Sequence, residues 1–228
     1  MGHGSSVLFS IGPLEVTGPV VTMWVIIAVL GFVSWLATRN LKEVPGPLQN
    51  LAELAVDKLR ELYSDGLNRE ALDKYLPVLG TFFIFIITCN YSGLLPGAGK
   101  LFAVPTASLS VTGGLAVSSL LFTLYAGCRK KGVWGYFKVL CGPSVALVVL
   151  MLPLNLIEQV VRPVSLAMRL YGNISGEETA VEQMSHVLPV LLPVVMQVLS
   201  LLFGAIQAIV FTKLVAAYLE EATEEEEE

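Results

Sequence analysis

The chain has 228 residues, of which 54% are hydrophobic and 14% are charged. An ordinary soluble domain is about one quarter charged, so this composition argues against a soluble globular protein. The net charge of -5 arises at the C terminus, where the last nine residues include seven glutamates, and no nucleic-acid partner is expected.

Apolar residues gather in five long runs, at 18–38, 76–96, 111–128, 143–168 and 187–219. A helix needs about 20 apolar residues to cross the hydrocarbon core of a bilayer, and each run meets or approaches that length. The pattern predicts an all-α polytopic membrane protein with about five membrane helices in one domain, 18–219. Residues 1–17 are expected to form an outer N-terminal segment, and 220–228 a solvated acidic tail.

An amphipathic helix is predicted at about 47–65, between the first two membrane helices. Leu48, Leu51, Ala55, Leu59 and Leu62 recur there at helical spacing, with charged residues between them. Such a helix lies on the membrane surface or against a partner.

The region 136–176 is too long for one upright crossing, and Pro143, Pro153 and Pro163 interrupt it. Because a proline inside a helix removes a backbone hydrogen bond, two broken or strongly tilted helices are expected here. The final run, 187–219, is also long for a perpendicular crossing.

Basic residues indicate the orientation of the chain. Six lie in 39–75 and four in 129–138, whereas 1–17, 97–110 and 172–186 together contain only Lys100. The two basic segments should therefore face the cytoplasm, which places the N terminus outside and the C terminus in the cytoplasm.

Arg169 lies within one of the most apolar stretches of the chain. On a helical wheel at about 100° per residue, polar and small side chains share its stripe, namely Glu158, Arg162, Ser165, Asn173, Gly176 and, at about 80°, Glu177. An arginine at mid-bilayer costs about 2.5–3.5 kcal/mol on insertion scales, so it generally faces a partner or a watery cavity. The alternative is that Arg169 reaches lipid headgroups from the end of its apolar run.

A facing stripe is predicted on the final run, with Gln207 as its deepest polar residue. Ser200, Gly204, Gln207, Phe211, Leu214 and Tyr218 step along one side of that helix. The simpler interpretation of Gln207 is a hydrogen bond between helices, worth about 0.6–2 kcal/mol.

No Ser/His pair, metal-ligand cluster or phosphate-cradling glycine loop is evident in the sequence. We therefore expect no catalytic residue, no metal, no cofactor and no nucleotide site, and the chain is not an enzyme on its own.

The stretch "RPVSLAMRLYGNISGEE", followed by "IQAIVFTKLVAAYLEE", resembles subunit a of the F-type ATP synthase. "NYSGLLPG" and "VPTASLSVT" resemble two further stretches of that family, in the expected order, and the resemblance runs from about residue 20 to 219. It implies a stator subunit in which the last two helices are long and steeply tilted beside a ring of c subunits. Peripheral-stalk subunit b, other ATP synthase subunits and membrane lipid are further implied partners.

The same resemblance implies roles for individual residues. Arg169 matches the family's essential arginine, which faces the ring carboxylates and separates two aqueous half-channels. Asn173 and Gln207 match polar positions near it. Counting from Arg169 gives Glu178 the position of the half-channel acid, whereas the wheel favours Glu177, and both remain candidates.

Other positions depart from the family pattern. Ser108 and Ser110 stand where many members carry aspartate and asparagine, respectively. Ser200 stands where some members carry an ionisable residue. These three are candidates for half-channel lining. Asn90 either lines the same channel or ends a helix with a polar group, and His186 is a candidate for the channel mouth.

A stand-alone secondary ion transporter or channel is the alternative function. It predicts paired internal repeats with interrupted helices, and the polar stripe occurs only once. The expected location is the bacterial cell inner membrane, with the thylakoid membrane as the alternative.

Overall fold

The computed structural model describes residues 7–11, 14–39, 41–64, 67–94, 103–141, 148–185 and 191–223. These residues form mostly helix: α1 (Gly18–Thr38), α2 (Pro47–Tyr63), α3 (Arg69–Tyr91), α4 (Leu109–Cys141), α5 (Val148–Ser185) and α6 (Leu191–Thr223). Two short 3-10 turns, η1 (Ser92–Leu94) and η2 (Pro105–Ala107), lie between α3 and α4. The predicted outer segment also contains an antiparallel hairpin, β1 (Val7–Ile11) and β2 (Leu14–Thr17), which the all-α prediction did not include.

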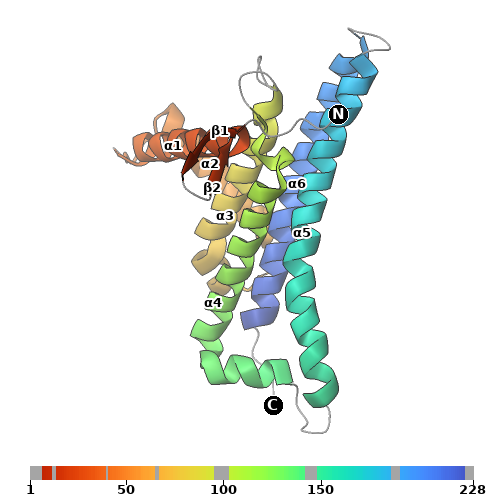
Figure 1. Cartoon of the computed structure of the whole chain (residues 1–228). Helices are drawn as coiled ribbons and strands as arrows, with labels where there is room; N and C mark the ends of the chain where they lie inside the picture. Colours follow the sequence, from red (N-terminus) through yellow and green to blue (C-terminus); the bar gives the residue numbers. More distant parts are fainter. Residues whose placement is uncertain are drawn as a thin grey trace.

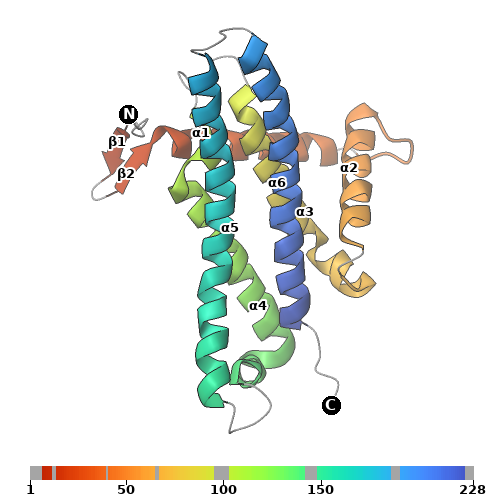
Figure 2. The same cartoon turned by 90° about the vertical axis from the view of Figure 1, so that its right-hand side faces the viewer.

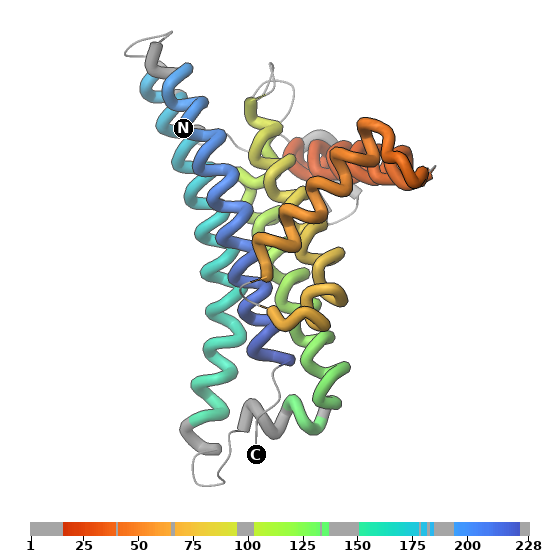
Figure 3. Tube along the Cα trace, turned by 180° about the vertical axis from the view of Figure 1, so that it is seen from behind, coloured from red at the N-terminus to blue at the C-terminus, as the bar shows by residue number. Residues whose placement is uncertain are grey.

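Helices α3, α4, α5 and α6 pack side by side into one bundle, and α5 and α6 run together along its length (Figures 1, 2 and 3). The core between them is apolar, and several of its side chains are fully buried, among them Leu79, Ile86, Leu170, Val215 and Leu219. In a membrane the close packing of these side chains, rather than their removal from water, holds the helices together.

Within the described part of the chain, four helices are long and apolar enough to cross a membrane: 18–38, 69–94, 109–132 and 194–223. Four of the five predicted runs are confirmed in this way, and the fold is that of an all-α polytopic membrane protein. The fifth run, 143–168, overlaps the first half of α5. Helix α6 ends at Thr223, so Glu220 and Glu221 belong to this helix, although the sequence placed them in the tail.

No break occurs at Pro153 or Pro163, because α5 is one continuous helix of 38 residues that includes both, and Pro143 lies outside the described residues. A single proline leaves the flanking hydrogen bonds of a long helix in place, and neighbouring helices support the freed backbone groups. The bend occurs instead in α4, where Gly132 has a φ of 73°, a conformation that side chains disfavour.

Helix α1 lies across the bundle rather than along it (Figures 1 and 2). At about 1.5 Å per residue α1 is about 30 Å long, the thickness of the hydrocarbon core, whereas α5 is about 57 Å long. If α1 stands upright in the bilayer, α5 and α6 must therefore be steeply tilted. This arrangement agrees with the tilt implied by the family resemblance.

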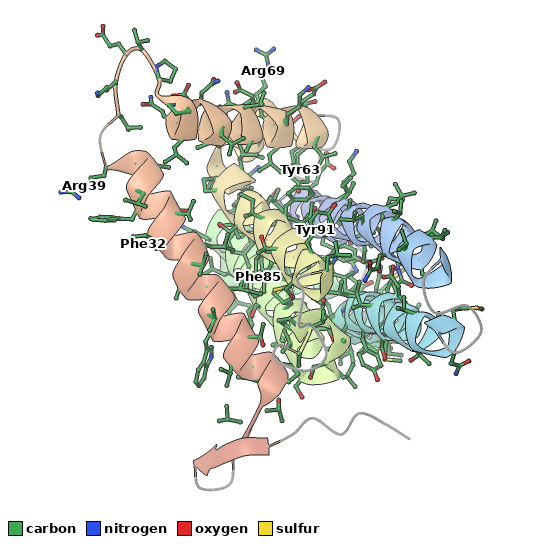
Figure 4. The ribbon with its side chains drawn as sticks, turned by 90° about the horizontal axis from the view of Figure 1, so that it is seen from above. Phe32, Arg39, Tyr63, Arg69, Phe85 and Tyr91 are labelled. Atoms are coloured by element: carbon green, nitrogen blue, oxygen red, sulfur yellow. The ribbon has the colours of Figure 1, made fainter. Side chains whose placement is uncertain are left out.

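Helix α2 has the predicted amphipathic character, and its C-terminal end is fastened to the bundle. Leu48 and Leu51 are exposed, whereas Leu59 and Tyr63 are buried. The Tyr63 hydroxyl donates a hydrogen bond of 2.7 Å to Oγ1 of Thr212 on α6. Burial raises the pKa of Tyr63 to about 12. Figure 4 shows Tyr63 on the side of α2 that faces the bundle.

Replacement of Tyr63 by phenylalanine is expected to lower stability by about 0.5–1.5 kcal/mol, because it removes one buried hydrogen bond and keeps the ring. Thermal unfolding of the purified protein would measure the change. Tyr75→Phe is the matched control, since Tyr75 is also buried but its hydroxyl has no hydrogen bond within the described part of the chain. Equal stability of the two variants would contradict the anchoring role of Tyr63.

Candidate functional site

Polar side chains of α5 and α6 meet inside the bundle, as their two stripes predict. Nδ2 of Asn173 donates a hydrogen bond of 2.8 Å to Oε1 of Gln207, which is 4% exposed. Two positions 34 residues apart in sequence are thereby joined. The hydrogen bond between helices proposed for Gln207 is confirmed, and its partner is the asparagine of the Arg169 stripe.

Helix α3 contributes Asn90 to the same level of α6. Nδ2 of Asn90 donates to the carbonyl oxygen of Gly204 at 3.0 Å, and the Tyr91 hydroxyl donates to that of Leu201 at 3.2 Å. A β-carbon at Gly204 would lie 3.2 Å from Cβ of Asn90, so the two helices approach this closely because residue 204 has no side chain. Figure 4 shows Tyr91 at the end of α3, close to α6.

The acidic candidates lie further along α5. Glu177 is half-buried, and the hydroxyl of Ser200 on α6 donates a hydrogen bond to its carboxyl group. Glu178 follows in the same helix, but its side chain lies outside the described part of the structure, as does the whole of His186.

Three buried polar atoms at this level of α6 have no hydrogen-bond partner among the described residues: Oδ1 of Asn90, Oε1 of Glu177 and Nε2 of Gln207. An unsatisfied buried donor or acceptor costs about 1–3 kcal/mol, and ordered water commonly satisfies such groups. The Asn90, Asn173, Glu177, Ser200 and Gln207 side chains form what we call the polar cluster. Its unpaired atoms give it the chemistry of a hydrated path.

The serine candidates lie near the turn η2, which packs against α5. The Ser108 carbonyl oxygen accepts the backbone N–H of Thr112, and Ser110 is exposed on the first turn of α4. Among the described residues, no hydrogen bond joins either serine to the polar cluster. Sequence reasoning overlooked Thr106 of η2, which is completely buried and has an unpaired Oγ1. The hydroxyl side chain in the "VPTAS" stretch was the feature of the sequence that could have pointed to Thr106.

Arg169 is exposed, and it forms no hydrogen bond or ion pair with any residue that the structure describes. On one side of it Leu166 and Leu170 are buried in the core, and on the other Met168 is 54% exposed. The guanidinium therefore lies at the edge of the bundle, and no carboxylate among the described residues pairs with it.

The position of Arg169 along α5 argues against a simple contact with headgroups at the helix end. Helix α5 runs on from Arg169 to Ser185, about 24 Å at 1.5 Å per residue. Along the helix axis Arg169 therefore lies well inside α5 rather than at its end.

An exposed apolar surface adjoins Arg169. On α5 it comprises Ile157, Val160, Val161, Val164 and Met168, and on α6 it comprises Val195, Val198, Leu202, Phe203 and Ile206. Exposed apolar side chains in such numbers face lipid or a protein partner. The unpaired arginine thus borders a surface that another hydrophobic body must cover.

These features define a class: a polytopic helical membrane protein with an unpaired arginine and a polar cluster on its two longest helices. No cluster of metal-ligating side chains occurs among the described residues. The family model described as ATP synthase A chain matches residues 20–220, and the chain belongs to this family.

Two relatives support the same assignment. The chain is 36% identical over 232 residues to "ATP synthase subunit a" of Gloeobacter violaceus, which covers 99% of this chain and 92% of the relative. It is 37% identical over 212 residues to "ATP synthase subunit a" of Moorella thermoacetica, which covers 93% of each.

Replacement of Gly204 by alanine is expected to destabilise the protein by about 1–3 kcal/mol, because the new methyl group forces α3 away from α6. Thermal unfolding of the purified protein would measure the loss. Gly113→Ala is the control, since a β-carbon there meets no atom within 4 Å. If Gly204→Ala were as stable as Gly113→Ala, the close approach at Asn90 would be unimportant.

Proposed function

We propose that this chain is the stator subunit a of a rotary ATP synthase, and that it carries protons to and from carboxylates on a ring of c subunits. Membership of the ATP synthase A chain family supports the stator role. The observation that carries the finer proposal is the unpaired guanidinium of Arg169 beside an exposed apolar surface. ATP chemistry then belongs to partner subunits, and this chain is a non-catalytic membrane component.

In the proposed mechanism Arg169 attracts the ionised form of a ring carboxylate, because an opposite charge nearby favours the charged form. Guanidinium suits this role better than an amine, since it keeps its proton even when it is desolvated. The ring would cover the apolar surface of α5 and α6, and the missing partner of the charge would come from the ring.

The same charge would keep two half-channels apart. A proton that crosses a potential of 100 mV releases about 2.3 kcal/mol, and a direct leak past the ring would dissipate that free energy. A fixed positive charge between the two half-channels repels a proton that has not been carried around by the ring.

The polar cluster is proposed to line the half-channel on the outer side. In the predicted orientation α6 begins outside; Ser200 and Gly204 lie in its first half, and Gln207 lies at its midpoint. Asn90 and Glu177 converge on this part of α6 and offer unpaired oxygen atoms to water. Glu178, Ser108, Ser110 and His186 remain candidates for the same path.

The proposed location is a bacterial inner membrane or a thylakoid membrane, with the N terminus outside and the C terminus in the cytoplasm. Besides the ring, subunit b of the peripheral stalk, other subunits of the synthase and membrane lipid are the proposed partners. Co-purification of a small, ring-forming hydrophobic subunit would test this assignment, and its consistent absence from intact complexes would contradict it.

Replacement of Arg169 by alanine should abolish proton-driven ATP synthesis while the complex still assembles, because the exposed side chain supports no internal contact. Synthesis by the purified complex in sealed proteoliposomes, driven by an imposed pH difference, would measure this. Arg129→Ala is the control, since it removes a surface arginine from the basic segment of α4. Normal synthesis in Arg169→Ala would defeat the proposed function.

Replacement of Glu177 or Glu178 by glutamine should slow proton flow, because an amide cannot take up and release the proton as a carboxyl group does. Passive proton flow through the membrane sector would be followed with a pH-sensitive dye. The single variant that slows flow identifies the acid, which the sequence left open between the two residues. Unchanged flow in both single variants and in the double variant would remove the acid assignment.

A further inference from the structure

A second arginine on the stripe of Arg169 is paired within the chain itself. The Arg162 side chain is 14% exposed, and its Nη2 donates to Oε1 of Glu158 at 2.7 Å and to Oε1 of Glu221 at 2.6 Å. Its guanidinium also stacks on the ring of Tyr218, 4.7 Å from the ring centre. Glu221 and Tyr218 belong to α6, so this arginine fastens α5 to α6.

The two arginines share a stripe but differ in surroundings. They are seven residues apart, which on a helix at about 100° per residue is a difference of only about 20° in direction. Arg162 has two carboxylates and an aromatic ring, whereas Arg169 has no polar partner among the described residues. The chain therefore satisfies one charge of the stripe and leaves the other exposed.

Polar links between α5 and α6 bracket Arg169. Arg162–Glu221 lies seven residues before it on α5, and Asn173–Gln207 lies four residues after it. Between the two links the contact surface is apolar, with Leu166, Leu170, Phe211 and Val215 buried there. Apolar contacts are not directional, so the two polar links determine how α5 is rotated about its own axis.

Helix α4 supports the link at Arg162. Nε2 of Gln159 donates to the Tyr136 hydroxyl at 3.1 Å, beyond the bend in α4. A β-carbon at Gly127 would lie 2.7 Å from Cε2 of Tyr136, so glycine at 127 lets this ring pack closely against α4. Three helices thus meet at the cytoplasmic end of the bundle.

A cavity with about 100 Å³ of space for water lies against the ion pair, lined by Lys131, Tyr136, Glu158, Arg162 and Glu221, among others. Nε of Arg162 is buried and has no hydrogen-bond partner among the described residues. Both carboxylates of the ion pair are more than half exposed, so the pair is hydrated on their side.

We infer that Arg162 is a positioning residue: with Glu221 it holds the rotation of α5 that directs Arg169 outward, and so keeps the barrier at Arg169 closed. This inference rests on the proposed function. Loss of either Arg162 or Glu221 removes this link between α5 and α6, and the apolar contacts that remain do not by themselves hold the rotation of α5. A change in that rotation turns Arg169 away from its outward direction.

The test uses the complete ATP synthase in proteoliposomes and compares two flows. One is ATP synthesis driven by an imposed pH difference, and the other is decay of the same pH difference without ADP, when the ring does not turn. Loss of positioning raises the leak and lowers synthesis, so the ratio of synthesis to leak falls by at least about threefold in Arg162→Met and Glu221→Gln. A purely structural loss would reduce the amount of complex and both flows together, and the ratio would stay constant.

Matched variants sharpen the comparison. Glu220→Gln removes the neighbouring carboxylate of α6, which forms no ion pair among the described residues, and should leave the ratio unchanged. Arg162→Lys keeps the positive charge and should restore part of the ratio lost in Arg162→Met. Glu221→Gln changes a side chain that is 61% exposed, so its variant should assemble even if Arg162→Met does not.

The outcomes separate this inference from the proposed function. The positioning role is overturned if the ratio of synthesis to leak is unchanged in Glu221→Gln. It is also overturned if both flows fall equally in Arg162→Met while neither flow changes in Glu221→Gln. If Arg169→Ala still abolishes synthesis in that case, the proposed function stands without it. If Arg169→Ala synthesises ATP normally, the proposed function fails whatever the Arg162 variants do.

Discussion

The unpaired charge of Arg169 is the constraint on which the rest of the structure depends. A guanidinium beside hydrocarbon is unfavourable unless an acidic partner pairs with it or water hydrates it. The described residues of this chain offer no acidic partner to Arg169. The charge of Arg162, by contrast, is neutralised within the chain, because Glu158 and Glu221 both form ion pairs with it. The contrast between two arginines of one helical stripe is the clearest sign that Arg169 is directed toward another molecule.

Close packing around small residues makes the polar cluster possible. Gly204 allows α3 to bring Asn90 onto a backbone carbonyl of α6, and Gly127 allows Tyr136 to reach Gln159. Helices in a membrane gain little from hydrophobic burial against lipid, so close contact and hydrogen bonds between helices hold them together. The contacts that position the cluster also leave some of its atoms unpaired, which suits a path for protons through water.

Prediction from sequence succeeded where a periodic pattern or a motif carried the information. The helical wheel placed Asn173 and Gln207 on facing stripes, and the structure joins them directly. It failed where distant segments compete with local preference: Pro153 and Pro163 do not break α5, and the bend of the neighbouring helix occurs at Gly132. Asn90 was left open between a channel residue and a helix end, because its contact with Gly204 joins residues 114 positions apart.

The sequence by itself determined that the chain is a helical membrane protein, which family it belongs to, and that Arg169 shares a stripe with other polar residues. These properties follow from hydropathy, helical period and a local motif, all of which are written in consecutive residues. Only the tertiary structure decided that Arg162 is paired whereas Arg169 has no polar partner among the described residues. That difference depends on Glu221, which lies 59 residues from Arg162 and reaches it only when α5 and α6 pack together.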